Sequence, residues 1–117
     1  MSRQIKFRGK RVYSDKWVYG YYAELVENGE YFYWINEPNG DSTDVIPETV
    51  GQYVGLKDRH GVKIYEGDIL EGLGCVVWGD RECRFLIDVI GERYEIFFDE
   101  LPQNELEVIG NIHERSE

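Results

Sequence analysis

The stretch GQYVGLKDRHGVKIYEGDIL, residues 51–70, decides the fold class. Short runs rich in β-branched and aromatic residues alternate here with glycine-containing turns, which is typical of short strands. Gly61 suits the positive φ that the turn Lys57–Gly61 needs, and a second turn falls at Glu66–Asp68. The stretch therefore predicts strands at 49–54, 62–65 and 68–71. Four of its side chains are expected in the core: Tyr53, Ile64, Tyr65 and Ile69.

Toward the C-terminus the chain continues as short β segments. Four strands are expected, at Cys75–Trp78, Cys83–Val89, Arg93–Phe98 and Glu107–Ile112. Gly79-Asp80 and Gly91-Glu92 are expected as tight turns, and Asp99–Asn104 as one helical or 3₁₀ turn before Pro102 limits it. An open sheet of so many short strands leaves exposed edges, whereas a small closed or half-closed barrel removes them. We therefore expect a barrel here.

Toward the N-terminus, Asn28-Gly29 lies between two β-rich runs, Lys16–Val26 and Tyr31–Ile35. Asn-Gly is the strongest short-range hairpin signal, because a type I′ turn needs positive φ at both central residues. Gly20, inside the first run, indicates a bulge or a close backbone approach. A first strand is expected at Ile5–Arg8, with its basic side chains on a solvated face.

The polar segment Asn36–Asp44 is expected to be a loop, and a soft boundary falls at about residue 46. The predicted fold class is mainly β with little helix. One domain, residues 1–117, would hold an N-terminal antiparallel β-hairpin lobe (1–46) and a small barrel (47–117).

The 117 residues carry a net charge of −10, and no apolar run approaches the length of a membrane span. Met1–Lys10 is charged and lacks the apolar region of a signal peptide. These features disfavour a membrane protein, a secreted disulfide scaffold and a disordered tail. The acidic balance also disfavours non-specific DNA binding, which needs a positive surface.

The charge is unevenly distributed. Residues 1–22 carry six basic groups and one acid, whereas residues 23–117 carry seven basic groups and twenty-two acids. The basic N-terminal segment, residues 1–22, predicts contact with an anionic partner or with the acidic face of another subunit. Its candidate binding residues are Arg3, Arg8 and Arg11.

The two cysteines, Cys75 and Cys83, flank the expected turn at Gly79-Asp80. That turn would place Val76 opposite Cys83 and Cys75 diagonal to it, a poor geometry for a disulfide. There is no Cys-x-x-Cys spacing to indicate zinc. We expect reduced, partly buried thiols in a cytoplasmic protein.

No catalytic constellation stands out. Asp58, His60, Glu66 and Asp68 lie close enough in sequence to suggest acid–base chemistry or a divalent cation. The simpler interpretation is that the carboxylates cap backbone N–H groups in turns. We therefore expect no enzyme, no catalytic residues, no cofactor and no metal.

Aromatic residues cluster in the expected hairpin, and on alternating strands some of them must point outward. The candidate binding residues are Tyr19, Tyr21, Tyr33 and Trp34. Exposed aromatics anchor protein partners or stack on bases, and base stacking needs nearby cations that this segment largely lacks. Contact with a protein, including self-association, is the better interpretation.

Together with IKFRG (5–9) and VIGNIHE (108–114), the stretch 51–70 closely resembles the YopX-like family of phage and prophage proteins. The resemblance implies a phage-derived origin, a mainly β fold with an SH3-like barrel, and residence in the bacterial cytoplasm. It implies no activity. The segments 10–48 and 72–105 carry no matching motif.

The resulting hypothesis is an accessory phage protein that acts without catalysis, as a protein-interaction or self-assembling module and as a homo-oligomer. One alternative is an acidic decoy that occupies the nucleic-acid site of a host protein. Another is a nucleic-acid binder that uses the basic N-terminal strand. No membrane partner is expected.

Overall fold

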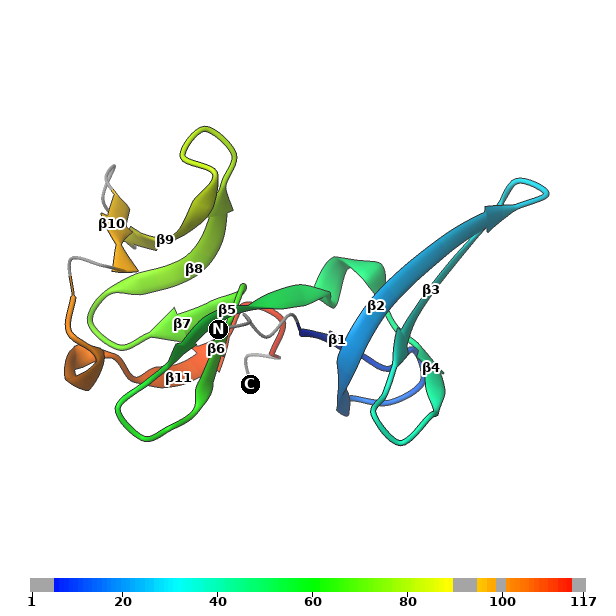
Figure 1. Ribbon diagram of the computed structural model, residues 1–117, viewed down its shortest axis with the longest axis horizontal. Helices are drawn as coiled ribbons and strands as arrows, with labels where there is room; N and C mark the ends of the chain where they lie inside the picture. The colour runs from blue at the N-terminus through cyan, green and yellow to red at the C-terminus, as the bar shows by residue number, and fades with distance from the viewer. Residues whose placement is uncertain (1–5, 90–94, 99–100, 115–117) are drawn as a thin grey trace. The chain divides into compact units, whose positions relative to one another are not determined.

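The computed structural model describes residues 6–89, 95–98 and 101–114, and these form two antiparallel sheets (Figure 1). The first sheet has the order β4-β3-β2-β1-β5-β6 and the second the order β10-β9-β8-β7-β11. The first contains β1 (Phe7–Lys10), β2 (Trp17–Glu27), β3 (Glu30–Asn36), β4 (Ser42–Asp44), β5 (Gly51–Lys57) and β6 (Lys63–Tyr65). The second contains β7 (Asp68–Leu70), β8 (Gly74–Gly79), β9 (Arg84–Val89), β10 (Glu95–Phe97) and β11 (Val108–Asn111). The 3₁₀ turns η1 (Pro47–Thr49) and η3 (Gln103–Glu105) lie between strands. The mainly β fold class is therefore confirmed.

The chain divides into two compact units between Tyr53 and Val54, inside β5. The sequence placed a boundary earlier, near residue 46. The segment after that point still belongs to the first unit, because the Thr49 hydroxyl accepts a hydrogen bond of 2.9 Å from the Lys10 N–H. In addition, Gln52 pairs with Phe7 across β5 and β1.

The β2–β3 hairpin of the first unit forms as predicted. Asn28 and Gly29 have φ of 54° and 81°, the positive values of a type I′ turn, and Glu27 pairs with Glu30 across it. A Cβ on Gly20 would lie 2.1 Å from the Asn36 carbonyl oxygen, so the expected close backbone approach is confirmed.

The loop prediction for Asn36–Asp44 was partly wrong, because Ser42–Asp44 forms the edge strand β4. Its pairing with β3 is reinforced by the Ser42 hydroxyl, which donates to Asn36 Oδ1 at 2.8 Å. A polar sequence is compatible with this strand because it lies at the edge of the sheet.

One face of the first unit's sheet carries its core. Val18, Ile35 and Val45 are buried there, and the partly buried Phe7, Tyr22, Tyr33 and Val50 pack around them. The expectation that the basic side chains of β1 are solvated is wrong for Arg8. This residue is only 7% exposed, and its guanidinium lies 4.6 Å from the centroid of the Trp17 ring.

The second unit has its own core of Ile64, Leu70, Val76, Ile87, Phe98 and Leu106. Tyr53, Ile64 and Tyr65 are buried as predicted, but Ile69 is only half-buried and Leu70 is buried instead. Adjacent strand residues point to opposite faces, so an error of one position exchanges a core side chain for an outward one.

The SH3-like barrel is not confirmed, because neither sheet is closed over the described residues. The strands expected to form it are divided by their hydrogen bonds. β5 and β6 continue the first sheet, whereas β7 to β11 form the second, with β10 and β11 at its two ends. The sequence predicted the strands of this region, but it did not predict which strands pair with one another.

The turn between β8 and β9 is longer than expected. Gly79 pairs with Arg84, so the loop spans residues 80–83, and the Cys83 N–H donates to the Gly79 carbonyl oxygen at 2.7 Å. The resulting register places Val76 opposite Ile87, so the prediction of Val76 opposite Cys83 was wrong. Both cysteines are free, and burial, with the negative charges of Asp88, Asp68 and Glu66, raises the pKa of Cys75.

The remaining turn predictions differ in outcome. The 3₁₀ turn expected before Pro102 is supported by its described residues, because Phe98 has 3₁₀ conformation and the Leu101 N–H donates to the Phe98 carbonyl oxygen at 3.2 Å. A further 3₁₀ turn, η3, follows Pro102. The turn at Gly91-Glu92 and the start of the strand at Arg93 lie outside the described residues, as does Ile5.

Candidate protein-binding surface

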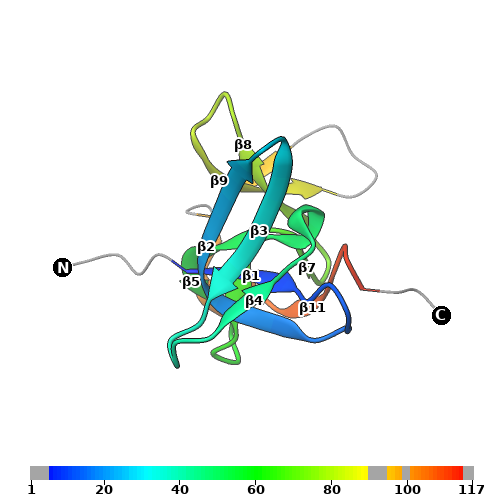
Figure 2. The same ribbon diagram turned by 90° about the vertical axis from the view of Figure 1, so that its right-hand side faces the viewer.

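We call residues 21–36 of the β2–β3 hairpin the arm; its outer part, near the turn, extends past the neighbouring strands (Figure 1). β1 pairs with β2 only over Trp17–Gly20, and β4 pairs with β3 only over Trp34–Asn36. The Tyr33 carbonyl oxygen also accepts from the Val45 N–H, at 3.1 Å. Beyond Tyr33 and its partner Glu24, over the described residues, the two strands of the arm pair only with each other. Figure 2 shows the same pair of strands from the side.

The arm carries apolar side chains on both of its faces. Paired residues share a face, and pairs alternate between faces along the hairpin. Leu25 pairs with Phe32 on one face, and their side chains are 46% and 44% exposed. Val26 pairs with Tyr31 on the other face, and these are 58% and 65% exposed. The outer arm therefore has no core of its own.

Of the two faces of the β2–β3 hairpin, the one that points away from the first unit's core exposes apolar side chains over the greater length. We call it the aromatic face and define it by Tyr19, Tyr21, Leu25, Phe32 and Trp34, which share one side of β2 and β3 by strand alternation and register. Tyr19 and Tyr21 are exposed, whereas Trp34 is half-buried and its indole N–H donates to Asn36 Oδ1 at 3.1 Å.

The predicted aromatic residues thus divide between two faces. Tyr19, Tyr21 and Trp34 come together on the aromatic face, but Tyr33 lies on the core face, where its ring stacks on Tyr31 with centroids 6.4 Å apart. Leu25 and Phe32 were missed as site residues. Both lie in the β-rich runs that were predicted as strands, and nothing local shows that no core lies beneath them.

The arm is acidic as well as apolar. From Trp17 to Leu56 the sequence contains no lysine or arginine. Seven acids lie in the same span: Glu24, Glu27, Glu30, Glu37, Asp41, Asp44 and Glu48. Glu27 stands directly opposite Glu30 beside the turn, a destabilising arrangement of like charges.

Tyr22 remains uncharged at physiological pH. Burial and then the neighbouring Glu24 raise the pKa of Tyr22 to about 12, and its hydroxyl donates to Glu24 Oε2 at 2.9 Å. The negative charge of the arm therefore resides on its carboxylates.

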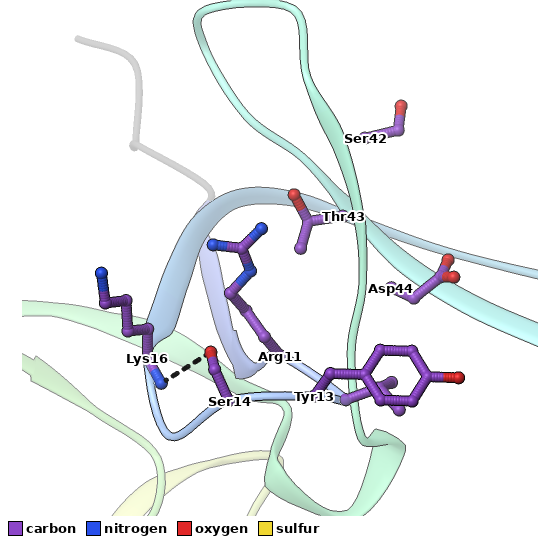
Figure 3. A pocket seen from close by; sticks show the side chains of 8 residues that line it. Arg11, Tyr13, Ser14, Lys16, Ser42, Thr43 and Asp44 are labelled. Carbon is purple, nitrogen blue, oxygen red and sulfur yellow. Dashed lines mark hydrogen bonds between the residues drawn. The ribbon is translucent and has the colours of Figure 1, made fainter.

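The base of the hairpin carries the opposite charge. The loop Arg11–Lys16 and strand β4 line an open hollow of about 430 Å³ (Figure 3). Arg11 and Lys16 are both exposed there, and the Lys16 N–H donates to the Ser14 hydroxyl at 3.3 Å. The three predicted arginines do not form one site, because Arg8 is buried and Arg3 lies outside the described residues.

The conspicuous carboxylates of the second unit serve a structural role. Asp58 is 1% exposed, and its carboxylate accepts hydrogen bonds from the N–H groups of His60, Val62 and Val108 at 2.8, 2.9 and 3.0 Å. Asp68 accepts from the Tyr65 N–H at 2.7 Å. The prediction that these carboxylates cap turns is confirmed. Over the described residues, no three His, Cys, Asp or Glu side chains are grouped to hold a metal ion.

Asp58 also joins the two most distinctive segments of the sequence. It belongs to the central stretch 51–70, and its partner Val108 opens the closing segment VIGNIHE. A family model described as YopX protein matches residues 6–117. The chain belongs to the YopX family. No curated protein matches it significantly.

In this YopX chain, the central and closing motifs contribute to the packing of the second unit, because their polar groups bond one another. The arm lies within the range that the family model matches, outside the central and closing motifs. Within the described residues, the YopX chain has no helix long and apolar enough to cross a membrane.

Proposed function

We propose that this YopX chain is a non-enzymatic phage or prophage accessory protein of the bacterial cytoplasm that binds a protein through its arm. The observation that carries the proposal is that the outer arm exposes apolar pairs on both of its faces. Leu25 pairs with Phe32 on one face and Val26 with Tyr31 on the other, and all four side chains are exposed. A two-stranded ribbon of this kind is marginally stable in water by itself. A partner that covers the aromatic face would stabilise it.

The energetics favour such a contact. The side chains of Leu25 and Phe32 are nearly half exposed, so burying each against a partner contributes about 1 kcal/mol to the free energy of binding. Burying Tyr21 contributes more. Aromatic anchors of this type dominate binding energy at protein interfaces. The glutamates around them favour a partner whose apolar surface is flanked by lysine or arginine.

Two alternatives have different support. The absence of lysine and arginine from Trp17 to Leu56 also fits an acidic decoy of a nucleic-acid-binding host protein. Direct nucleic-acid binding has less support, because the arm offers no cation for phosphates and Arg8 is buried.

The double substitution Leu25→Ser/Phe32→Ser tests the arm directly. We expect the variant to lose, by at least tenfold, the retention of a specific protein that the wild-type chain captures from nuclease-treated host lysate. The readout is quantitative mass spectrometry of retained proteins, followed by direct binding of the purified partner.

A matched control is Ile109→Ser/Ile112→Ser, which removes two side chains of the second unit that are each 57% exposed. The control is expected to retain the partner. Equal retention by wild type, control and arm variant would show that the arm is not the docking surface.

A further inference from the structure

We infer that the partner of the arm contributes an extended segment that pairs, as an additional antiparallel strand, with the edge of β2 over Tyr21–Glu27, which we call the open edge. The segment carries lysine or arginine opposite Glu24 and Glu27 and apolar side chains between them. The inference rests on the proposed function and names the kind of partner that the arm binds.

The open edge is the side of β2 that faces β1. β1 pairs with β2 only over Trp17–Gly20. Over the described residues, no strand pairs with this side of β2 from Tyr21 to Glu27. A long strand edge of this kind is a template for a further strand, and many proteins bind extended peptides in this way.

Three residues direct their backbone N–H and C=O groups to the open edge. In an antiparallel pair, alternate residues exchange hydrogen bonds with the partner strand. The Arg11 N–H donates to the Lys16 carbonyl oxygen at 3.0 Å, in the register of β1 and β2, so the even-numbered residues of β2 bond toward β1. The same alternation places the backbone groups of Tyr22, Glu24 and Val26 at the open edge.

The opposite edge of the arm is shorter. β4 pairs with β3 over Trp34–Asn36, and the Val45 N–H donates to the Tyr33 carbonyl oxygen at 3.1 Å. Over the described residues, this leaves only Glu30–Phe32 of β3 beyond the covered part. Strands in proteins usually have about five or six residues, so the edge of β2 is the better template.

The open edge lacks the features that usually protect an edge strand. Soluble proteins place lysine, proline or a bulge on exposed edges. From Tyr21 to Glu27 the chain has no lysine and no proline, and its register with β3 is continuous. Leu25 and Val26 are 46% and 58% exposed there. This edge is therefore suited to pairing with another strand.

The carboxylates of the open edge define the charge of the added strand. Glu24 and Glu27 are exposed, and the sequence from Trp17 to Leu56 contains no lysine or arginine. The Tyr22 hydroxyl donates to Glu24 Oε2 at 2.9 Å, and a carboxylate has acceptor sites for further donors. Opposite charges in cross-strand pairs are stabilising and like charges destabilising. A basic segment is therefore favoured over an acidic one.

A second copy of β2 is a poor occupant of the open edge. The symmetric antiparallel pairing that uses the same three outward-facing residues places Glu24 of one copy opposite Glu24 of the other. Like charges directly opposite destabilise the pair. The net charge of −10 adds general repulsion between copies.

Strand alternation sets the pattern of the segment. Residues opposite Tyr22, Glu24 and Val26 lie on the core face, and residues opposite Leu25 and Glu27 lie on the aromatic face. An antiparallel segment therefore reads, from its N-terminus, basic, apolar, apolar, basic, any residue, apolar. Its two basic side chains are three positions apart, so they lie on opposite faces, each beside its own glutamate.

Two peptides test this pattern. The probe is KVVKTVT with both ends blocked, and EVVETVT differs from it only in charge. In NMR titrations at low salt, we expect the chain to bind KVVKTVT at least tenfold more tightly. Bound peptide is expected to slow amide hydrogen exchange at Tyr22, Glu24 and Val26 but not at Ala23 and Leu25, which bond toward β3. A partner that covers only side chains would not produce this alternation.

Two substitutions of Glu24 separate the backbone contribution from the charge. Glu24→Pro removes the N–H at the centre of the open edge and none that bonds to β3, so we expect KVVKTVT to bind at least tenfold more weakly. Glu24→Gln keeps the N–H and removes the charge, so we expect a smaller loss of about threefold.

Charge reversal keeps the inference testable if the proline variant does not fold. Glu24→Lys/Glu27→Lys is expected to bind EVVETVT more tightly than KVVKTVT. Glu71→Lys/Asp80→Lys is the matched control, because it makes the same change of net charge at exposed positions of the second unit. It is expected to keep the wild-type preference.

Three outcomes would overturn the inference. The first is equal binding of the two peptides, or no binding at millimolar concentration. The second is slow exchange at the three outward-facing N–H groups without peptide, which identifies a second copy if dilution abolishes it and an occupant within the chain if it does not. The third is a lysate protein that Glu24→Pro retains and Leu25→Ser/Phe32→Ser loses. In that case the proposed function stands and only the docking at the open edge is wrong.

Discussion

Replacing Asp58 by alanine is expected to destabilise the second unit by about 3–5 kcal/mol. The carboxylate is 1% exposed and accepts from three backbone N–H groups, of His60, Val62 and Val108. Each buried donor left without an acceptor costs about 1–3 kcal/mol, less where water reaches it. The total is a large fraction of the stability of a typical domain.

The variant Asp58→Asn distinguishes the contributions of the three hydrogen bonds to stability. Its carbonyl oxygen can still accept from His60 and Val62, which share Oδ1 in the wild type, but its amide would face the Val108 N–H. We expect a smaller loss of about 2 kcal/mol. Urea unfolding followed by the indole signal of Trp78, which lies in the second unit, measures both variants.

The exposed turn substitution Asp80→Asn is the control and is expected to change stability by less than about 0.5 kcal/mol. Asp58→Ala with wild-type stability would show that the bonds to Asp58 contribute little to the second unit.

The effect of Asp58 should depend on pH. Burial by itself raises the pKa of Asp58, but the N–H donors of Val108, Val62 and His60, with the nearby His60 side chain, lower the net pKa below its ordinary value. A lowered folded-state pKa means that the stabilisation is present above pH ~4 and is lost as pH falls through the folded value. The stability difference between wild type and Asp58→Asn should therefore narrow below pH ~4 in acid titrations of unfolding.

The second large effect is expected for Gly74→Ala, at about 3 kcal/mol or more. A Cβ at this position would lie 2.0 Å from the Asp88 carbonyl oxygen and 2.9 Å from the Val89 Cα. Both atoms belong to the backbone of β9, so the clash is relieved only if β8 and β9 separate. Their pairing carries the buried residues Val76 and Ile87 of the second core.

Gly110→Ala is the matched control, because it also lies in a strand of the second unit and its Cβ would meet only Glu114 Oε2, at 3.6 Å. We expect a change of less than about 1 kcal/mol. Thermal unfolding of the two variants measures the difference, and equal stabilities would contradict the close approach at Gly74.

Local features of this chain were predictable, and their physical basis is short in range. The Asn28-Gly29 turn depends on the φ preferences of two residues, and the bonds from Asp58 to the N–H groups of His60 and Val62 close within a single turn. The third bond to Asp58 comes from Val108, fifty positions away, and no local pattern indicates it. The same limit explains the wrong register around Cys83, where two extra loop residues shift every pair of β8 and β9.

The candidate site was half predictable for a related reason. Tyr19, Tyr21 and Trp34 were identified from composition and alternation, and the structure places them on one face. Tyr33 fell on the other face, and Leu25 and Phe32 were missed, because exposure depends on what lies opposite a side chain. Arg8 shows the converse, since a basic residue in an alternating strand is buried beneath Trp17.

By itself, the sequence determined the mainly β class, the hairpin turn, the capping carboxylates, the YopX family and the separation of basic and acidic segments. Each of these depends on residue chemistry and on spacings of a few positions. Only the tertiary structure decided which strands share a sheet, that neither sheet closes over the described residues, and that the outer arm has no core beneath it. Those properties depend on strand partners and buried surfaces that distant residues contribute. Hydrophobic burial is non-directional, so a local apolar pattern does not specify which distant segment will cover it.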